Sequence, residues 1–216
     1  DTATIAEVLG AAGYGIYMSG KWHVTHHVDA PHDSWPCRRG FERFFGFMMG
    51  AASYFNPRAM VRDHELIETP PGDFYFTDAI SDEAVRQIED HVARTPDRPF
   101  FQYVAYTAPH WPLHALPEDI ERYRGRFDAG WDRLREERLA RMIEMGILSD
   151  NCRMTERDPE VPAWEAAADR EWEARRMEVY AAQIDRMDQG IGRIVEALRR
   201  NGRLENTLII FLADNG

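Results

Sequence analysis

Residues 19–24, written SGKWHV, place a lysine and a histidine two positions apart, directly after the run YGIYM. That run is predicted to be a short buried strand, and in an extended chain Lys21 and His23 point to the same side. A lysine can hold an anionic oxygen, and a histidine can donate to that oxygen or move a proton. The stretch therefore predicts a site for an anionic group at a strand end. On this stretch alone, a surface lysine beside a packed histidine stays an alternative.

A second histidine of this kind follows another predicted strand. Residues 100–106, FFQYVAY, are dense in aromatic and β-branched side chains and predict a strand. The strand leads into APHWP, where His110 lies between prolines that restrict its direction. We interpret His110 as a second candidate for the anion site, while a structural loop histidine stays open. His114, in the same loop, is the weaker candidate.

Oxygen ligands follow a third predicted strand. Residues 207–213, TLIIFLA, form an apolar run typical of strands buried on both faces, and the run ends in Asp214 and Asn215. A carboxylate and an amide oxygen are hard donors of the kind that Ca²⁺ or Mg²⁺ takes. Two oxygens do not complete such a site, so further ligands must come from elsewhere. A simple Asn-Gly turn is the alternative.

Helical patterns precede each of these strands. Thr4 and Glu7 fit a capping box, and apolar residues recur at helical spacing after Thr77 and across residues 177–198. Helices that alternate with buried strands predict an α/β fold with a mostly parallel sheet and helices on both faces. Ligands of such sheets bind beyond the carboxyl ends of the strands. The polar residues after the three strands are therefore expected to lie together.

Composition excludes several classes of partner. The chain has 216 residues, 44% of them hydrophobic, and a formal net charge of -11, which argues against nucleic-acid binding. No apolar run is long enough to cross a membrane, and the two cysteines form no disulfide framework. The compartment stays open between periplasmic or secreted and cytoplasmic. The stretch HVTHHVDAPH fits no standard zinc spacing.

Four stretches together resemble the sulfatase family. Residues 4–24 are similar to its helix followed by G-K-W-H, and residues 38–47, RRGFERFFGF, are similar to its R-G-F-D-x-F-x-G stretch. Residues 106–117 look like its A-P-H-x-P loop, and residues 180–216 look like its long helix and the strand before S-D-N-G. The stretches occur in the family's order and extend from end to end of the chain.

The resemblance implies an alkaline phosphatase-like fold, a divalent cation, usually Ca²⁺ with Mg²⁺ possible, and hydrolysis of aryl or carbohydrate sulfate esters. The family's nucleophile is a formylglycine made from Cys or Ser in C/S-x-P-x-R. By position, Lys21 would bind the sulfate, and His110 would contact it or protonate the leaving oxygen. His23 would contact the formylglycine and help its intermediate to collapse. Asp214 and Asn215 would be metal ligands.

Some family features are missing from the chain. The nucleophile motif and an acidic ligand pair precede G-K-W-H in the family, and another lysine follows D-N-G. Residues 1–216 are therefore expected to be an internal portion of a single catalytic domain of a bacterial sulfatase, inactive alone. SWPCR fits the motif's letters but follows G-K-W-H, so Ser34 is predicted to be a loop residue. A phosphonate monoester or phosphodiester hydrolase of the same superfamily, or a non-catalytic relative, is the alternative.

Overall fold

Two compact units make up the chain in the computed structural model, which describes residues 2–213. The first, here called the sheet unit, contains residues up to 112 together with those from 186 onward. The second, here called the helical unit, contains residues 113–185. Each unit is described by itself.

A five-stranded sheet with the order β4-β3-β2-β1-β5 forms the centre of the sheet unit. Its strands are β1 (Gly15–Lys21), β2 (Arg43–Phe47), β3 (Met60–Arg62), β4 (Glu65–Ile67) and β5 (Phe100–Ala105). Strand β1 runs parallel to β2 and β5, whereas β3 and β4 pair antiparallel at one edge. The sheet is therefore mixed, with the three parallel strands grouped at its β2-β1-β5 side.

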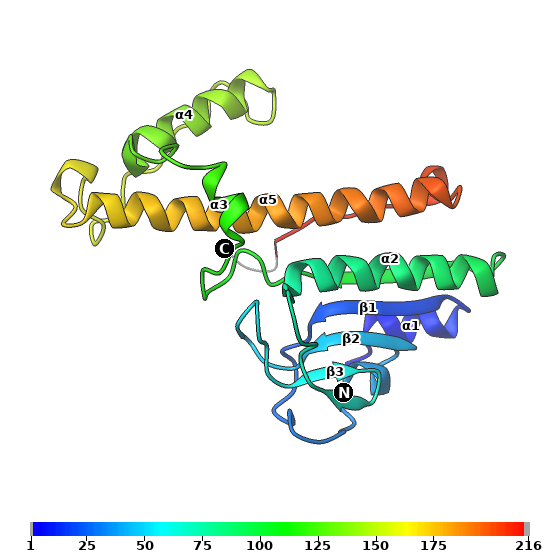
Figure 1. The fold of residues 1–216 in the computed structure, drawn as a ribbon. Coiled ribbons are helices and arrows are strands. Elements are labelled where there is room, and N and C mark those ends of the chain that lie inside the picture. Colours follow the sequence, from blue (N-terminus) through cyan, green and yellow to red (C-terminus); the bar gives the residue numbers. More distant parts are fainter. Residues whose placement is uncertain (1, 214–216) are drawn as a thin grey trace. The chain divides into compact units, whose positions relative to one another are not determined.

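Helices cover both faces of this sheet, as the sequence predicts (Figure 1). Helix α1 (Ile5–Ala11) packs through Ala6 against Ile16 and Met18 of β1. Helix α2 (Phe76–Arg94) packs on the other face, where Phe76 and Ile80 join Phe45 and Phe47 of β2. Because side chains alternate between faces along a strand, neighbouring residues of β2 serve opposite layers.

The first helix begins as its sequence indicates. The Thr4 hydroxyl accepts from the backbone N–H of Glu7 at 3.1 Å, and the Glu7 carboxylate accepts from the backbone N–H of Thr4 at 2.8 Å. This reciprocal pair satisfies two donors that a helix start leaves without partners. Helix α1 ends at Ala11, and β1 begins four residues later at Gly15.

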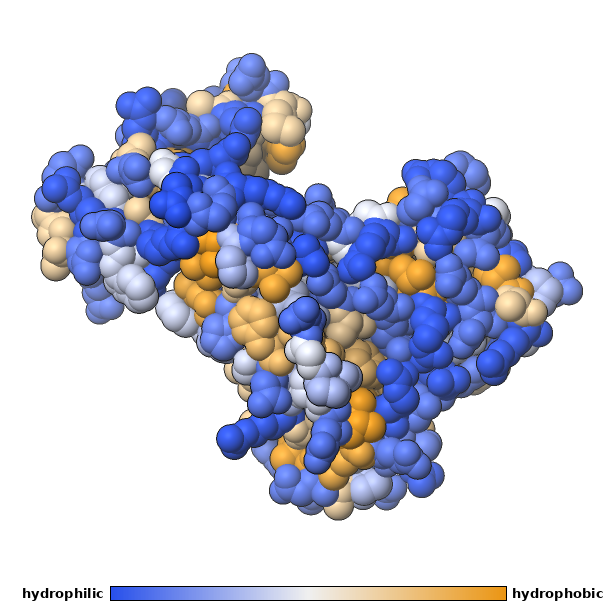
Figure 2. All heavy atoms as spheres, in the orientation of Figure 1, coloured by the Kyte–Doolittle hydropathy of each residue, from blue (hydrophilic) through white to orange (hydrophobic). Residues whose placement is uncertain are grey.

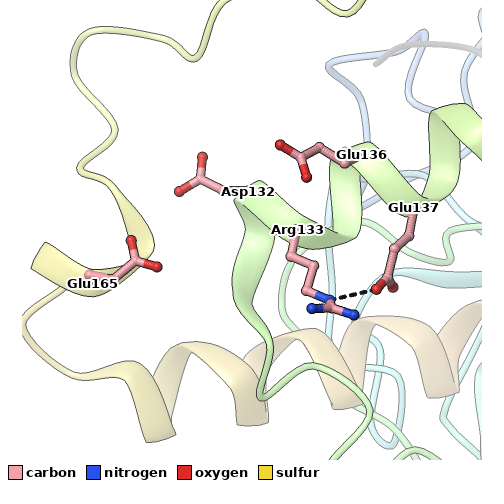
Figure 3. Close-up of a pocket in the computed structure, with 5 residues that line it drawn as sticks. All are labelled: Asp132, Arg133, Glu136, Glu137 and Glu165. Carbon is pink, nitrogen blue, oxygen red and sulfur yellow. Dashed lines mark hydrogen bonds and ion pairs between the residues drawn. The ribbon is translucent and has the colours of Figure 1, made fainter.

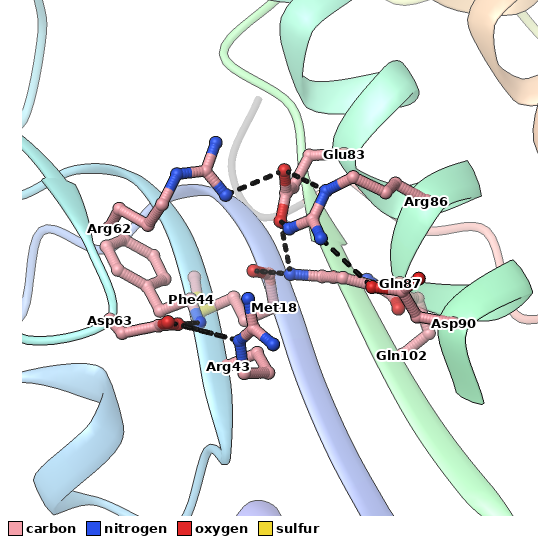
Figure 4. A network of polar contacts seen from close by, with 10 residues as sticks. All are labelled: Met18, Arg43, Phe44, Arg62, Asp63, Glu83, Arg86, Gln87, Asp90 and Gln102. Carbon is pink, nitrogen blue, oxygen red and sulfur yellow. Dashed lines mark hydrogen bonds and ion pairs between the residues drawn. The ribbon is translucent and has the colours of Figure 1, made fainter. Parts of the chain in front are cut away.

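A polar network fastens α2 to the sheet (Figure 4). The Gln87 amide donates to the backbone carbonyl of Met18 at 3.2 Å, so α2 is bonded directly to β1. The Glu83 carboxylate, only 5% exposed, is paired with Arg62 of β3 at 3.0 Å and with Arg86. A buried carboxylate without such partners would be strongly destabilising, so the two arginines are required for Glu83 to be tolerated there.

The long helix α5 (Arg170–Arg200) enters the sheet unit at residue 186 and packs along α2. Three ion pairs join the helices: Arg186 with Asp78, Arg193 with Asp82, and Arg200 with Glu89. The residue numbers rise together on both helices, so this part of α5 runs parallel to α2. A Cβ built on Gly190 would lie 2.1 Å from the Ser81 hydroxyl oxygen, so the helices meet most closely at this glycine.

The helical unit contains α3 (Pro117–Glu121), α4 (Gly130–Glu144), the short 3-10 helix η2 (Trp164–Ala166) and the first half of α5. The rings of Trp131 and Trp164 meet edge to face with centroids 4.7 Å apart, which holds η2 against α4. Among the helices that the structure describes, none has both the length and the apolar composition needed to span a bilayer.

The strand predicted over residues 207–213 is wrong. After the short helix η3 (Leu204–Asn206), these residues form no strand, and Leu208, Ile210 and Phe211 are 85%, 71% and 74% exposed. A strand needs a neighbour for its backbone hydrogen bonds, and within residues 2–213 the sheet ends at β5. The surface in Figure 2 is largely hydrophilic, with hydrophobic areas in between. The exposed apolar side chains of residues 207–213 therefore differ from the charged surface that the net charge of -11 indicates.

Candidate active site at the carboxyl ends of β1 and β5

Lys21 and His110 lie at the same end of the sheet, where β1 and β5 finish. Lys21 is the last residue of β1, directly after Gly20, and Gly20 is paired with Ala105, the last residue of β5. His110 follows Ala105 by five positions, in the loop that continues β5. Because β1 and β5 are parallel, both side chains belong to the carboxyl end of the sheet, where α/β folds bind ligands.

His23 is held against the end of β2. Its backbone N–H donates to the carbonyl of Met48 at 3.2 Å, one step beyond the bond from Trp22 to Phe47 at 3.0 Å. His23 has a φ of 57°, in the left-handed region that non-glycine residues seldom adopt. The extended backbone therefore ends before His23, so the simple alternation expected for Lys21 and His23 does not apply there. The imidazole is exposed to solvent.

Trp22 and Ser34 connect the same segment to the following loop. The Trp22 indole N–H donates to the Ser34 carbonyl at 2.8 Å, and its ring contacts Phe41 edge to face. Ser34 lies in a turn, as predicted, and its hydroxyl is 2.6 Å from the Thr25 hydroxyl and 2.8 Å from Nδ1 of His32. The Ser34 hydroxyl is therefore engaged within its own loop.

Two glycines, Gly20 and Gly46, lie where the backbones of β1, β2 and β5 approach most closely, and are here called the glycine floor. A Cβ on Gly20, whose φ is 119°, would lie 2.0 Å from the carbonyl oxygen of Ala105. A Cβ on Gly46 would lie 1.7 Å from the carbonyl oxygen of Gly20. Both contacts are with backbone atoms, which cannot move aside, so only glycine fits at either position. The carboxyl ends of β1, β2 and β5 therefore meet without any side chain between them.

The loop after β5 fixes His110 through its backbone and its ring. The Tyr54 hydroxyl donates to the His110 carbonyl at 3.0 Å, and the His110 N–H donates to the Thr107 carbonyl at 2.8 Å. Nδ1 of His110 lies 2.6 Å from the carbonyl oxygen of Trp111 and must donate to it, since a carbonyl only accepts. In the neutral ring Nε2 is then the acceptor nitrogen.

Neither cysteine offers a ready nucleophile next to these residues. Cys37 packs partly buried in the core beside α1, and burial raises the pKa of its thiol to about 12. The thiolate is the reactive form of cysteine, and it is scarce at neutral pH when the pKa is this high. Cys152 lies in the helical unit, in the loop after α4.

The metal ligands expected from the sequence, Asp214 and Asn215, lie outside the described residues. Within residues 2–213, no group of three or more His, Cys, Asp or Glu side chains could hold a metal ion. The metal site therefore stays a prediction.

A hollow of about 420 Å³ in the helical unit has a different character (Figure 3). It is lined by Asp132, Arg133, Glu136, Glu137 and Glu165, and its one cation, Arg133, is already paired with Glu137 at 2.7 Å. A lining of four carboxylates repels a sulfate or phosphate ester. The hollow is therefore not a candidate site for the oxyanion that Lys21 would bind.

Sequence reasoning did not identify Tyr54, Gly20 or Gly46 as parts of the site. The sequence resemblance at RFFGF does not by itself place a strand end beside His23, although Met48, directly after β2, accepts the His23 backbone N–H. A glycine within a strand indicates close approach of another backbone, and this signal was present in both β1 and β2. Nothing in the local sequence connects Tyr54 with the loop at His110.

The chain matches a family model described as Sulfatase over residues 1–216. It is 38% identical to an arylsulfatase of Klebsiella aerogenes, over 99% of this chain and 47% of that protein. It is 32% identical to an uncharacterized sulfatase of Schizosaccharomyces pombe, over 99% of this chain and 41% of that protein. The chain thus spans about half the length of these curated relatives.

Solved structures share the fold. One, determined in complex with its substrate D-glucosamine-2-N,6-O-disulfate, superimposes with a TM-score of 0.60 at 19% identity, over 95% of this chain and 48% of that one. At this identity the likeness concerns the fold alone. It confirms the α/β fold of the alkaline phosphatase-like class that the sequence predicts.

Proposed function

Because this chain belongs to the sulfatase family, we propose that it contributes Lys21, His23 and His110 to a sulfuric ester hydrolase. The observation that carries the proposal is the common position of these residues at the carboxyl ends of β1, β2 and β5. The substrate class is an aryl or carbohydrate sulfate ester. An arylsulfatase relative and a structural neighbour that takes a sulfated glucosamine support this class.

Lys21 would bind the sulfate group. It is the only lysine among the 216 residues, which otherwise carry their positive charge on arginine. A lysine ammonium is a compact charge that can be shared among several oxygens of a tetrahedral anion. Its half-buried position at the end of β1 restricts the side chain and strengthens its attraction for an anion relative to bulk water.

His110 would donate a proton to the leaving oxygen. Its Nδ1–H is used by the Trp111 carbonyl, so a second proton must reside on Nε2, in the imidazolium form. Nε2 can then donate to a sulfate oxygen or to the oxygen that departs with the alcohol. The Tyr54 hydroxyl, bonded to the carbonyl of the same residue, fixes where that Nε2 lies.

His23 would accept the proton that the reaction intermediate loses when it collapses. Its imidazole is solvent-exposed and lies beyond the end of β2, so it can exchange protons with water between steps. This position suits the collapse of an intermediate that must lose a proton. The two histidines would thus act as donor and acceptor from different loops.

Asp214 and Asn215 would supply hard oxygen ligands to a divalent cation, for which we propose Ca²⁺. Bound there, the cation would neutralise sulfate charge. Ser34, the serine of the stretch SWPCR that fits the letters of the nucleophile motif, is engaged by Thr25 and His32 in a turn. We propose that residues 1–216 form one portion of a catalytic domain that does not turn over alone.

The test uses the full-length protein with nitrophenyl sulfate as substrate. We expect turnover by the parent protein and none by residues 1–216 alone. Lys21→Ala, His23→Ala and His110→Ala in the parent should each lower kcat/KM by about 100-fold or more, the usual scale for losing charge stabilisation or proton transfer. Asp214→Ala should lose activity that excess Ca²⁺ partly restores.

The control is Arg153→Ala, which removes a cation from the loop after α4 in the helical unit. It should leave kcat/KM unchanged. Turnover of nitrophenyl phosphonate or phosphodiester substrates in preference to the sulfate would contradict the proposal and favour the other hydrolase class. Absence of any turnover by a correctly folded, metal-loaded parent would favour a non-catalytic relative.

A further inference from the structure

The imidazole of His23 rests against a glycine from the loop after β2. A Cβ built on Gly50 would lie 2.4 Å from Nε2 of His23, 2.7 Å from its Cε1 and 3.0 Å from its Cδ2. The three nearest atoms all belong to the same ring. The His23 ring therefore occupies the space that a side chain at position 50 would need, and no other group lies closer to that space.

Gly50 is not required for the shape of its own backbone. It is absent from the residues of positive φ in the part of the chain described, unlike Gly20 or Gly72. Its φ is therefore outside the left-handed region that favours glycine, so the structural reason for glycine at this position is the neighbouring ring. This separates Gly50 from most loop glycines, where a left-handed φ is the reason for the residue.

Little else holds the His23 ring. Within residues 2–213, neither ring nitrogen has a hydrogen-bond partner, and the side chain is exposed. Only the backbone is fixed, by the left-handed φ and by the N–H that donates to Met48. The position of Nε2 therefore depends on contact with the bare backbone of Gly50.

We propose that Gly50 is a positioning residue for His23. Its missing side chain lets the imidazole lie against the loop after β2, with Nε2 at a defined place beyond the end of that strand. An added methyl group would clash with a side chain that can swing into solvent, and not with backbone. Gly50→Ala would thus displace the ring and leave the fold in place. The kinetic part of this inference rests on the proposed function.

The first test observes the ring directly by NMR. The His23 imidazole resonances of the histidine-labelled full-length protein are assigned by comparison with His23→Gln. We expect Gly50→Ala to shift these resonances, while the resonances of buried His91 stay in place and Tm changes by no more than about 2 °C. The matched control is Gly192→Ala, because a Cβ on Gly192 meets nothing within 4 Å and its φ is not left-handed.

The second test is a double-mutant cycle on hydrolysis of nitrophenyl sulfate by the full-length protein. Gly50→Ala should lower kcat about 10- to 100-fold, the scale expected for a misplaced catalytic group, with a smaller change in KM. In a His23→Ala background the same substitution should have no further effect, because its target is gone. The pH profile of kcat should change in Gly50→Ala but not in Gly192→Ala.

Unchanged His23 resonances in Gly50→Ala would overturn the inference, whatever the activity. An equal loss of kcat with and without His23 would also overturn it, since Gly50 would then act through something else. A parent protein that does not hydrolyse the sulfate ester would contradict the proposed function alone. In that case the NMR comparison still decides where the ring lies.

Discussion

The hydroxyl groups of Ser81 and Tyr106 lie 2.7 Å apart, where α5 passes over α2. The Ser81 hydroxyl donates to the Thr77 carbonyl at 3.0 Å, so the Tyr106 hydroxyl is the donor between the two. Burial raises the pKa of Tyr106 to about 12, and Gly190 is the residue of α5 that faces this pair. The last side chain before the His110 loop is therefore anchored under α5.

Gly190→Ala should destabilise the protein because its methyl group would lie 2.1 Å from the Ser81 oxygen and 2.8 Å from the Tyr106 oxygen. Overpacking of this kind costs about 1–3 kcal/mol of unfolding free energy. Gly192→Ala, two residues along the same helix, meets open space and should stabilise by about 0.5–1 kcal/mol. Urea denaturation of both variants of the full-length protein checks the difference. Equal effects at the two positions would contradict the close packing at Gly190.

Lys21 should be the one lysine modified by an amine-selective reagent. Reductive methylation with ¹³C-formaldehyde should give a single lysine signal beside that of the N-terminal amine in residues 1–216, because no other lysine is present. In the full-length protein, peptide mapping should show that sulfate or a non-hydrolysed aryl sulfate slows modification of Lys21. Chloride at the same ionic strength is the control. Equal protection by both salts would argue against an oxyanion site at Lys21.

Tyr54→Phe should loosen the His110 loop without disturbing the sheet. The substitution deletes the hydrogen bond from the phenol to the His110 carbonyl and should cost about 1 kcal/mol of unfolding free energy. We expect kcat to fall several-fold, because Nε2 of His110 loses a fixed position. Tyr14→Phe is the matched control, since the Tyr14 hydroxyl bonds no other residue in the described part of the chain. A larger loss in the control would contradict the assignment.

Cys37 should resist alkylation in the folded protein. Burial, and secondarily Asp63, raises the pKa of its thiol from 9.0 to about 12, so iodoacetamide at pH 8 should modify Cys37 only after unfolding. The raised pKa also means that stability from the neutral thiol is present below about pH 9 and is lost as pH rises toward 12. Urea midpoints at pH 9 and pH 11 should differ less in Cys37→Ser than in Cys152→Ser. Rapid labelling of native Cys37 at pH 8 would refute this.

The sequence predicted the elements whose signals are local. The capping box at Thr4, the apolar period of α2 and α5, and the aromatic strand β5 each depend on residues close together in the chain. These elements formed as expected. The common edge for Lys21 and His110 followed from the topology rule for parallel strands and is confirmed as a position, while their chemical roles stay predictions.

The remaining features depend on partners distant in sequence. An apolar run such as residues 207–213 becomes a strand only where another strand offers its backbone, and its composition cannot reveal whether one does. The left-handed φ of His23 likewise occurs together with a bond to Met48, 25 positions away. The contact between Gly50 and the His23 ring has no signature in either segment, and Asp214 and Asn215 lie outside the described residues.

The glycine floor has a consequence for redesign of the protein. Since a Cβ added to Gly20 or Gly46 would lie 2.0 or 1.7 Å from a backbone carbonyl oxygen, no substitution at either position can be used to reshape the site. Changes in substrate preference must come from the loops beside the site, residues 48–56 and 107–112. A saturation library should therefore keep both glycines and place its diversity in those loops. Selection from a random library would recover the same division of tolerant and intolerant positions.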